Sequence, residues 1–249
     1  MEIDLQEGKG ADASPGDAVV SPECPFCGGD TFEEIPRHGI GRCIQCNAKI
    51  RHRAAYVLLK EFCQIDKNSK IAHFAPEPQI SSKLNEMCGE NYTAYDFNNT
   101  RYKLGFEVRH CDLCKDIKSL PQAHYDVVMH NHVLEHVPCN YTIVLQQLHG
   151  LLKPGGVHIF SFPVYPGSYY REDQNPGVSR EARTRLYNQK DHLRLFGGRD
   201  FEQMVGRIFD LTNDYSLAQL VAPEKLLAAG IPPKRWVASG STVFAVRKL

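Results

Sequence analysis

Short apolar runs alternate with helical stretches through the middle of the chain. Five runs are rich in aliphatic and aromatic residues, which is typical of buried strands. They span residues 70–75, 91–97, 106–113, 125–133 and 156–164. Apolar residues at helical spacing predict helices between them, over 81–88 and 142–152. Strands that alternate with helices indicate βαβ units and a parallel sheet, so the pattern predicts an α/β fold.

Further elements are expected on both sides of this core. Residues 51–69 contain apolar residues at helical spacing and are predicted to form a helix that links the N-terminal part to the main domain. Near the C-terminus we expect a helix over 199–209 and strands over 210–217 and 241–249. The main domain is therefore assigned to residues 70–249.

Two segments lack this periodicity. Residues 1–22 are rich in small and acidic residues and are predicted to be a disordered tail. Residues 165–200 form a polar segment dense in Tyr and Arg. A loop of more than about 15 residues in a compact domain is usually functional or disordered. The aromatic and titratable side chains favour function, so this segment is interpreted as an insertion or lid beside a substrate.

Composition sets the broad class of the protein. Of 249 residues, 42% are hydrophobic and 23% charged, with 29 basic and 29 acidic side chains. These values are typical of a globular domain, and the neutral balance gives no overall field that would attract nucleic acid. No apolar run approaches the roughly 20 residues of a membrane span. The polar, acidic N-terminus does not resemble a secretory signal, so we expect a cytoplasmic protein without a membrane partner.

Four of the nine cysteines have the spacing of a metal site. Cys24 and Cys27 form one Cys-x2-Cys pair, and Cys43 and Cys46 form a second pair after a turn-rich segment. Two such pairs can bind one zinc ion tetrahedrally and leave no position for water, which predicts a structural zinc ribbon over residues 23–50. The alternatives are four unrelated buried cysteines or a redox pair. We expect the other five cysteines to be ordinary reduced thiols: Cys63, Cys88, Cys111, Cys114 and Cys139.

Polar side chains follow the predicted strands in an informative order. The second strand ends in Asp96, the third in Asp112, and the fourth in Asn131 and His132. Ligands of open α/β sheets bind at the carboxyl ends of the strands. An acid after the second strand can accept hydrogen bonds from ribose hydroxyls, and one after the third can meet a purine amine. Each acid can also end its strand simply by capping a turn.

The chain resembles class I S-adenosylmethionine-dependent methyltransferases, which have a Rossmann-like sheet with helices on both faces. The segments that carry the resemblance are YDVVMHNHVLEHVP (125–138) and LHGLLKPGGVHIFSFP (148–163). The whole of residues 22–249 is similar to a bacterial group of these enzymes with an N-terminal zinc ribbon. The matching stretches are RHR, HFAPEP, YREDQNP and DHLRLFGGRDF.

This resemblance implies a set of cofactor-binding residues. Those expected at the methionine end are His73, Phe74, Ala75, Pro76 and Glu77. Asp96 would bind the ribose hydroxyls, with Phe97 beside it. Asp112 and Leu113 would bind the adenine, and Asn131 and His132 would lie near the sulfonium. The first loop departs from the family because it has no glycine. A positive φ is costly without glycine, so we expect this loop to follow a different path.

Methyl transfer depends mainly on positioning, although a base helps when the acceptor carries a proton. The candidates for this role are His192, His132 and Asp191, with Asp191 orienting His192. Arg194 could bind an anionic group of the acceptor. The alternative is that Asp191, His192 and Arg194 only tie the long segment to the sheet.

Three functions are compatible with these features. The favoured one is methylation of a small molecule or biosynthetic intermediate. The second is methylation of RNA gripped by the zinc module, whose basic residues are Arg37, Arg42, Lys49, Arg51 and Arg53. The chain's neutral charge and the lack of an Asn-Pro-Pro-Tyr-like tetrad after the fourth strand argue against it. The third is a degenerate methyltransferase fold that only binds ligands.

Overall fold

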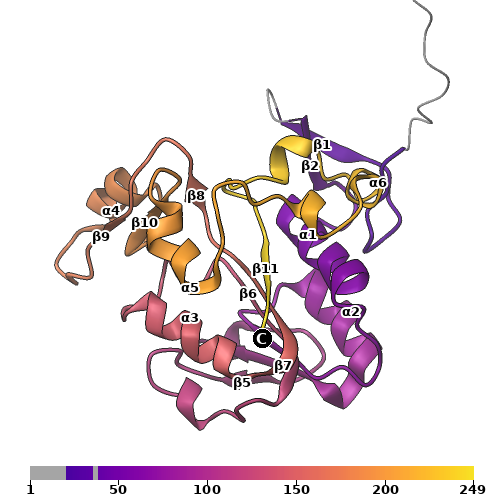
Figure 1. Cartoon of the computed structure of the whole chain (residues 1–249), viewed down its shortest axis with the longest axis horizontal. Coiled ribbons are helices and arrows are strands. Elements are labelled where there is room, and N and C mark those ends of the chain that lie inside the picture. Colours follow the sequence, from indigo (N-terminus) through magenta and orange to yellow (C-terminus); the bar gives the residue numbers. More distant parts are fainter. Residues whose placement is uncertain (1–20, 36–38) are drawn as a thin grey trace, which may run out of the picture.

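A parallel sheet forms the centre of the molecule, as the alternating pattern predicts (Figure 1). The computed structural model describes residues 21–35 and 39–249, so the tail predicted for residues 1–22 lies almost wholly outside the described residues. Within these ranges the sheet has six strands in the order β11-β7-β6-β3-β4-β5. The strands are β3 (Ile71–Phe74), β4 (Tyr92–Asp96), β5 (Val108–His110), β6 (Tyr125–Asn131), β7 (Leu152–Ser161) and β11 (Phe244–Arg247). All pairings are parallel except that of β11 with β7.

The register brings the carboxyl ends of the strands to one edge. Phe74, the last residue of β3, pairs with Tyr95 of β4 and with His130 of β6. The chain runs outward from β3 to β4 and β5, then returns to place β6 on the other side of β3. The strand order therefore reverses between β3 and β6, which is where open α/β sheets bind ligands.

Helices cover both faces of the sheet. Figure 1 shows α1 (Ile50–Val57) and α2 (Pro78–Cys88) on one side, and α3 (Tyr141–Gly150) and α5 (Arg207–Phe209) on the other. Helix α1 continues as a π-helical turn over Leu58–Phe62, and a π-helical turn over Glu202–Gly206 precedes α5. Short 3-10 turns occupy Gly89–Asn91, Asn99–Arg101, Ile117–Ser119, Leu217–Gln219 and Pro233–Arg235. The Rossmann-like fold predicted from the sequence is confirmed.

The segment over 165–200 is an ordered subdomain. A three-stranded sheet in the order β8-β10-β9 occupies this part of the described chain, together with one helix. Its elements are β8 (Val164–Tyr165), β9 (Arg171–Glu172), α4 (Arg180–Tyr187) and β10 (Arg194–Gly197). Phe196 of β10 packs against Phe162 at the end of the main sheet, with ring centroids 4.2 Å apart. This contact joins the subdomain to the core.

Two sequence predictions are wrong. No strand forms within the described residues 210–217, where Ser216 makes only an isolated bridge to Val237 and precedes a 3-10 turn. Polar residues at 212–214 leave too little apolar surface there for a buried strand. Cys114 and Cys139 are not free thiols but form a disulfide with a Cα–Cα distance of 5.9 Å. They follow β5 and precede α3, so only the fold brings them together. Cys63, Cys88 and Cys111 are free, as predicted.

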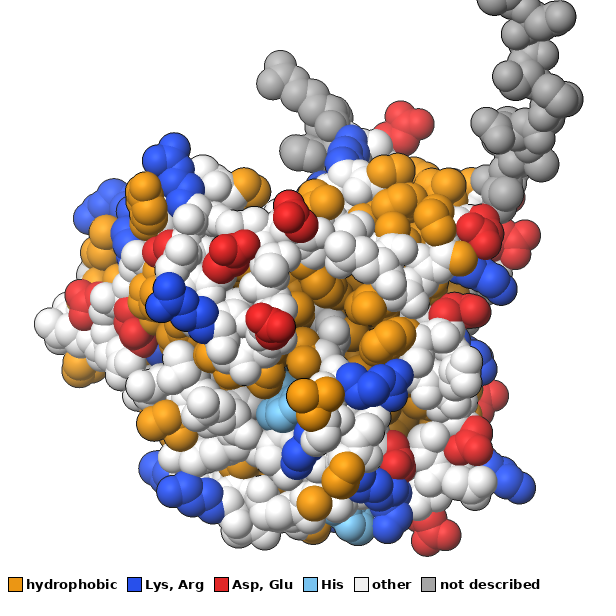
Figure 2. Space-filling model, in the orientation of Figure 1, with side chains coloured by type: hydrophobic (Ala, Val, Ile, Leu, Met, Phe, Trp, Pro, Cys, Tyr) orange, Lys and Arg blue, Asp and Glu red, His pale blue; other side chains and the backbone are white. Residues whose placement is uncertain are grey.

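The surface agrees with the neutral composition. On the face shown in Figure 2, acidic and basic side chains are interspersed. Among the described residues no helix has the length and apolarity needed to cross a membrane.

A hairpin of β1 (Phe32–Ile35) and β2 (Gly39–Cys43) forms the N-terminal module, beside α1 and α6 (Pro223–Ala228) in Figure 1. The fully buried Arg53 of α1 joins it to the main domain. Its guanidinium donates to the carbonyl oxygens of Gly41 and Ala48 in the module, at 2.9 and 2.8 Å. It also donates to Ala229 and Gly230 after α6, both at 2.8 Å. One side chain thus satisfies carbonyls from three segments of the chain.

We expect Arg53→Lys to lower the free energy of unfolding by roughly 2–4 kcal/mol. A lysine cannot reproduce the planar set of donors, and the abandoned carbonyls stay buried. Urea denaturation provides the measurement. The matched control is Arg42→Lys, because Arg42 is 55% exposed and forms a surface ion pair with Glu33; the loss of unfolding free energy in this variant should stay below about 0.5 kcal/mol. Equal losses in the two variants would contradict the role assigned to Arg53.

Candidate active site and metal cluster

The four cysteines of the N-terminal module converge on one point. The Sγ atoms of Cys24 and Cys46 are 3.5 Å apart, those of Cys27 and Cys43 are 3.6 Å apart, and all four lie within 4.8 Å of one another. Each pair spans a tight turn closed by a left-handed residue, Gly28 (φ +71°) or Asn47 (φ +59°). These spacings fit tetrahedral thiolate ligation of one ion.

The glycine-free loop after β3 adopts a left-handed conformation. Ala75 has a φ of +54°, and its N–H donates to the carbonyl of Tyr95 at 2.8 Å. The absence of glycine predicts a loop path without positive φ. The structure differs, because Ala75 itself adopts this conformation. His132, after β6, also has a positive φ (+53°) and donates its N–H to Ser161 at 2.8 Å. Such strain in non-glycine residues is concentrated at functional sites.

A cavity of about 540 Å³ lies at the carboxyl ends of β3, β4, β5 and β6. Its volume is within the range of small-molecule sites. It is lined by seven of the residues predicted to bind the cofactor: Phe74, Ala75, Asp96, Phe97, Asp112, Leu113 and His132. Phe97 lies at the cavity with 68% of its surface exposed, unusual for a large aromatic residue. Asp191, predicted to be catalytic, also lines this cavity.

Asp96 is held in place by its neighbours. Its Oδ2 accepts hydrogen bonds from Tyr102 Oη at 2.7 Å and from Arg101 Nη2 at 2.9 Å, and its Oδ1 accepts one from the Asn98 N–H. Asp112 Oδ1 accepts from the Cys114 N–H at 2.9 Å. Both carboxylates thus have fixed orientations at the cavity wall.

The other predicted cofactor residues form a buried network behind this wall. His73 lies between Tyr92 Oη and Glu77 Oε2, at 3.0 Å from each. Asn131 donates to Glu77 Oε2 and accepts from Ser161 Oγ at 2.8 Å. Burial raises the pKa of Glu77, but the hydrogen bond and charge of His73, with the charges of His52 and Arg51, outweigh it and bring this pKa to about 2. His73, Glu77, Asn131 and Pro76 line neither cavity.

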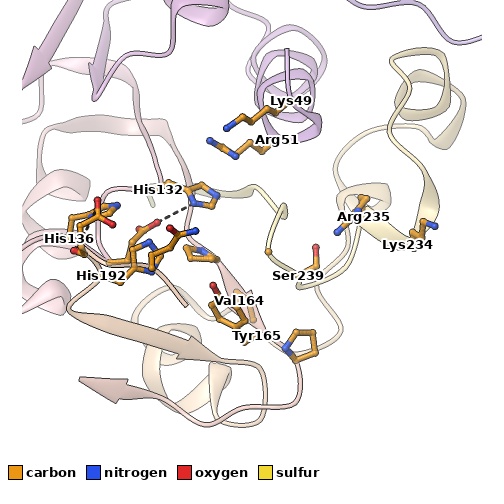
Figure 3. Close-up of a pocket in the computed structure, with 16 residues that line it drawn as sticks. Lys49, Arg51, His132, His136, Val164, Tyr165, His192, Lys234, Arg235 and Ser239 are labelled. Carbon is orange, nitrogen blue, oxygen red and sulfur yellow. Dashed lines mark hydrogen bonds and ion pairs between the residues drawn. The ribbon is translucent and has the colours of Figure 1, made fainter. Parts of the chain in front are cut away.

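A larger cavity of about 1100 Å³ adjoins the first (Figure 3). Lys49 and Arg51, from the start of α1, point into it towards His132. Its opposite walls come from residues 163–166 and from the C-terminal segment 234–240. His132, His136 and Asp191 line both cavities and so mark the boundary between them.

The catalytic candidates His192 and Asp191 lie near each other in the structure, but their contacts differ from those predicted. His192 is 6% exposed and lines the larger cavity, and burial lowers the pKa of its imidazole. Asp191 does not orient it by direct contact. The Asp191 carboxylate instead lies 3.7 Å from Nδ1 of His136. Arg194 is fully buried and bonds Glu172 and the carbonyls of Leu134 and Cys139, so it cannot bind an acceptor.

Several residues of the larger cavity were not singled out from the sequence. Glu135 is fully buried, with its Oε1 3.1 Å from Nδ1 of His132. The ring of His136 lies against His192, with centroids 4.8 Å apart. Lys49 and Arg51, expected in a basic zinc module, line this cavity. The sequence signal that could have identified this cluster is the set His132, Glu135 and His136 within five residues. The spacing of buried apolar residues does not account for these polar side chains.

The model of the methyltransferase-domain family matches residues 49–214, two thirds of the chain. The chain belongs to this family of class I S-adenosylmethionine-dependent methyltransferases. The matched region begins at Lys49, so it includes α1 as well as the sheet. No curated protein sequence matches the chain.

The chain is also similar to solved methyltransferase structures. One is the 1,6-didemethyltoxoflavin-N1-methyltransferase of Burkholderia thailandensis, solved with 1,6-didemethyltoxoflavin and S-adenosylhomocysteine. It is 18% identical, with a TM-score of 0.47 over 80% of this chain and 78% of that one. Another is an S-adenosylmethionine-dependent methyltransferase from Archaeoglobus fulgidus. It is 15% identical, with a TM-score of 0.44 over 80% of this chain and 94% of that one.

The left-handed conformation at position 75 predicts an unusual response to glycine. Ala75→Gly should change the free energy of unfolding by less than about 0.5 kcal/mol, because relief of backbone strain offsets the added entropy of the unfolded chain. Ala72→Gly, in strand β3 at full burial, should lower it by about 1 kcal/mol or more. Urea denaturation of both variants checks this. A loss at position 75 as large as that at position 72 would contradict the assignment of strain.

Proposed function

We propose that this protein transfers a methyl group from S-adenosylmethionine to a small anionic molecule. The observation that carries the proposal is the junction of the two cavities at His132 and His136. A cofactor in the smaller cavity would meet an acceptor in the larger one at these side chains. Transfer requires a direct line between donor and acceptor atoms, and adjoining cavities provide it.

The smaller cavity has the chemistry that the cofactor needs. Asp96 is positioned to accept from ribose hydroxyls and Asp112 from an adenine amine, while Phe97 offers an exposed ring for stacking. The bound cofactor supplies an electrophilic methyl on a sulfonium. Ala75 and His132 bring backbone close to the site, and the left-handed geometry at Ala75 removes the main reason to regard the first loop as degenerate.

The larger cavity favours an acceptor with negative charge. Lys49 and Arg51 point into the same space, and the charge of Arg51, with burial, lowers the pKa of Lys49. Nε of Arg51 is buried without a hydrogen-bond partner among the described residues. A carboxylate or phosphate between the two would relieve this repulsion. Burial lowers the pKa of His192, which favours the neutral imidazole that either a general base or a metal ligand requires.

The positions of the basic residues near the N-terminal module weaken the case for RNA as the substrate. Of the basic residues assigned to an RNA grip, Arg53 is buried, Arg42 pairs with Glu33, and Arg37 lies outside the described residues. Lys49 and Arg51 face the cavity. We therefore assign these charges to a small acceptor, with RNA as the less favoured alternative.

We further propose that Cys24, Cys27, Cys43 and Cys46 bind one structural zinc ion. Their Sγ spacing supports this, and four thiolates leave no open position for catalysis. The module would then fix the start of α1, and with it Lys49 and Arg51. Elemental analysis should find one tightly held zinc ion per chain.

Phe97→Ala should weaken S-adenosylmethionine binding by about tenfold or more, since stacking on a base contributes roughly 1–3 kcal/mol. Phe97 is exposed, so the variant should fold normally. Isothermal titration calorimetry measures the affinity. Ile143→Ala, which removes another exposed apolar side chain away from the cavity, should bind like the wild type. Wild-type protein that does not bind the cofactor at millimolar concentration would refute the proposed function.

Arg51→Gln should raise the KM for an anionic acceptor by about tenfold and leave kcat within about twofold, as expected for loss of uniform binding. The assay measures S-adenosylhomocysteine released in the presence of small carboxylic acids and, in parallel, their neutral amides. Arg42→Gln serves as the control outside the cavity. Equal use of acids and amides, with no effect of Arg51→Gln, would refute the anionic acceptor.

A further inference from the structure

Three side chains from two separate segments of the chain converge at the boundary between the cavities. Glu135 and His136 follow β6, and His192 precedes β10 in the 165–200 subdomain. One ligand atom of each lies within 4.8 Å of the other two. Figure 3 shows His136 and His192 side by side on the same wall of the larger cavity.

The carboxylate of this cluster is buried and its charge is only partly compensated. Glu135 is fully buried, and its ionic contact in the described structure is with His132 Nδ1, 3.1 Å from Oε1. Neither oxygen accepts a hydrogen bond of normal geometry from a described residue. Nδ1 of the buried His192 is likewise without a partner in the part of the chain described here. Burial of an ionised carboxylate without such compensation is strongly unfavourable.

The neighbouring elements do not supply the missing groups. Arg194 lies two positions after His192 and is buried, but its guanidinium donates to Glu172 and to the backbone carbonyls of Leu134 and Cys139. Nδ1 of His136 lies 3.2 Å from the Asp191 carbonyl oxygen, an arrangement that fixes the ring beside the cluster. Arg51 contributes only a longer-range attraction to Glu135. The cluster is thus fixed in position, with the Glu135 oxygens and Nδ1 of His192 left without a hydrogen bond of normal geometry among the described residues.

We propose that Glu135, His136 and His192 bind a divalent transition-metal ion, distinct from the ion of the four cysteines. Two imidazoles and one carboxylate are a common ligand set for zinc and for non-haem iron, and they leave coordination positions open. The ion would neutralise Glu135 and use the free imidazole nitrogens. Its open positions would face the larger cavity, which the three ligands line together.

The role of this ion rests on the proposed function, although its binding does not. An ion at this boundary would coordinate an oxygen of the acceptor and lower the pKa of that group. Lys49 and Arg51 would then bind the remote anionic end of the same molecule. The acceptor class this implies is an oxygen nucleophile that also carries a carboxylate or phosphate.

Cobalt titration of the zinc-containing, full-length protein, freed of any histidine tag, tests the binding. Wild-type protein should take up one Co²⁺ per chain beyond its resident zinc, with a weak visible spectrum that lacks thiolate charge-transfer bands. His136→Ala and Glu135→Gln should each weaken this uptake by at least about tenfold, since even outer-shell partners contribute that much to metal affinity. His136 is half-exposed, so its loss should not prevent folding.

His149→Asn is the matched control, because His149 is a partly buried histidine on α3 outside the cluster; it should bind Co²⁺ like the wild type. Uptake by the thiolates alone, or an affinity unchanged in both cluster variants, would overturn the proposal. Calorimetry with S-adenosylmethionine on the same samples separates the two proposals. Cofactor binding without Co²⁺ uptake rejects only the metal site, and Co²⁺ uptake without cofactor binding rejects only the methyltransferase function.

Discussion

The guanidinium of Arg53 joins segments that are far apart in the chain. Its donors bind carbonyls in the β1–β2 hairpin, in the segment before α1 and after α6. Its face also lies over the ring of Phe32, 4.7 Å from the centroid. Because this charge is fully buried, each carbonyl it loses would remain without water. The position of α1, and therefore of Lys49 and Arg51 in the larger cavity, depends on this contact.

Arg194 has the same role on the other side of the site. It is as deeply buried as Arg53 and ties β10 to Glu172 of β9 and to the loop between β6 and α3. That loop carries Glu135 and His136, and the residues just before β10 include His192. Arg53 therefore fixes the N-terminal module, and Arg194 fixes the 165–200 subdomain, on either side of the carboxyl end of the sheet. Their planar sets of donors suit this task better than an ammonium group.

The sheet itself supplies the third side of the site. Strand β6 ends one residue beyond the partner of the last residue of β3, and each strand is followed by a non-glycine residue with positive φ, Ala75 or His132. These turns expose the cavity at the point where the strand order reverses. Behind it, Glu77 and His73 form a hydrogen-bonded network that keeps the strand ends rigid. The larger cavity has walls from all three parts, so none of them could form it alone.

Local sequence determined the strands of the main sheet, the helices between them and the two Cys-x2-Cys turns, because side-chain periodicity and turn geometry are set by near neighbours. It also determined the order of Asp96, Asp112 and His132 along one edge of the sheet. Only the tertiary structure decided that Arg194 is structural, that Asp191 pairs with His136, and that Cys114 meets Cys139. These contacts join residues 25 to 60 positions apart. Such pairings depend on how distant elements pack against each other, and the residues near each position in the sequence do not determine that packing.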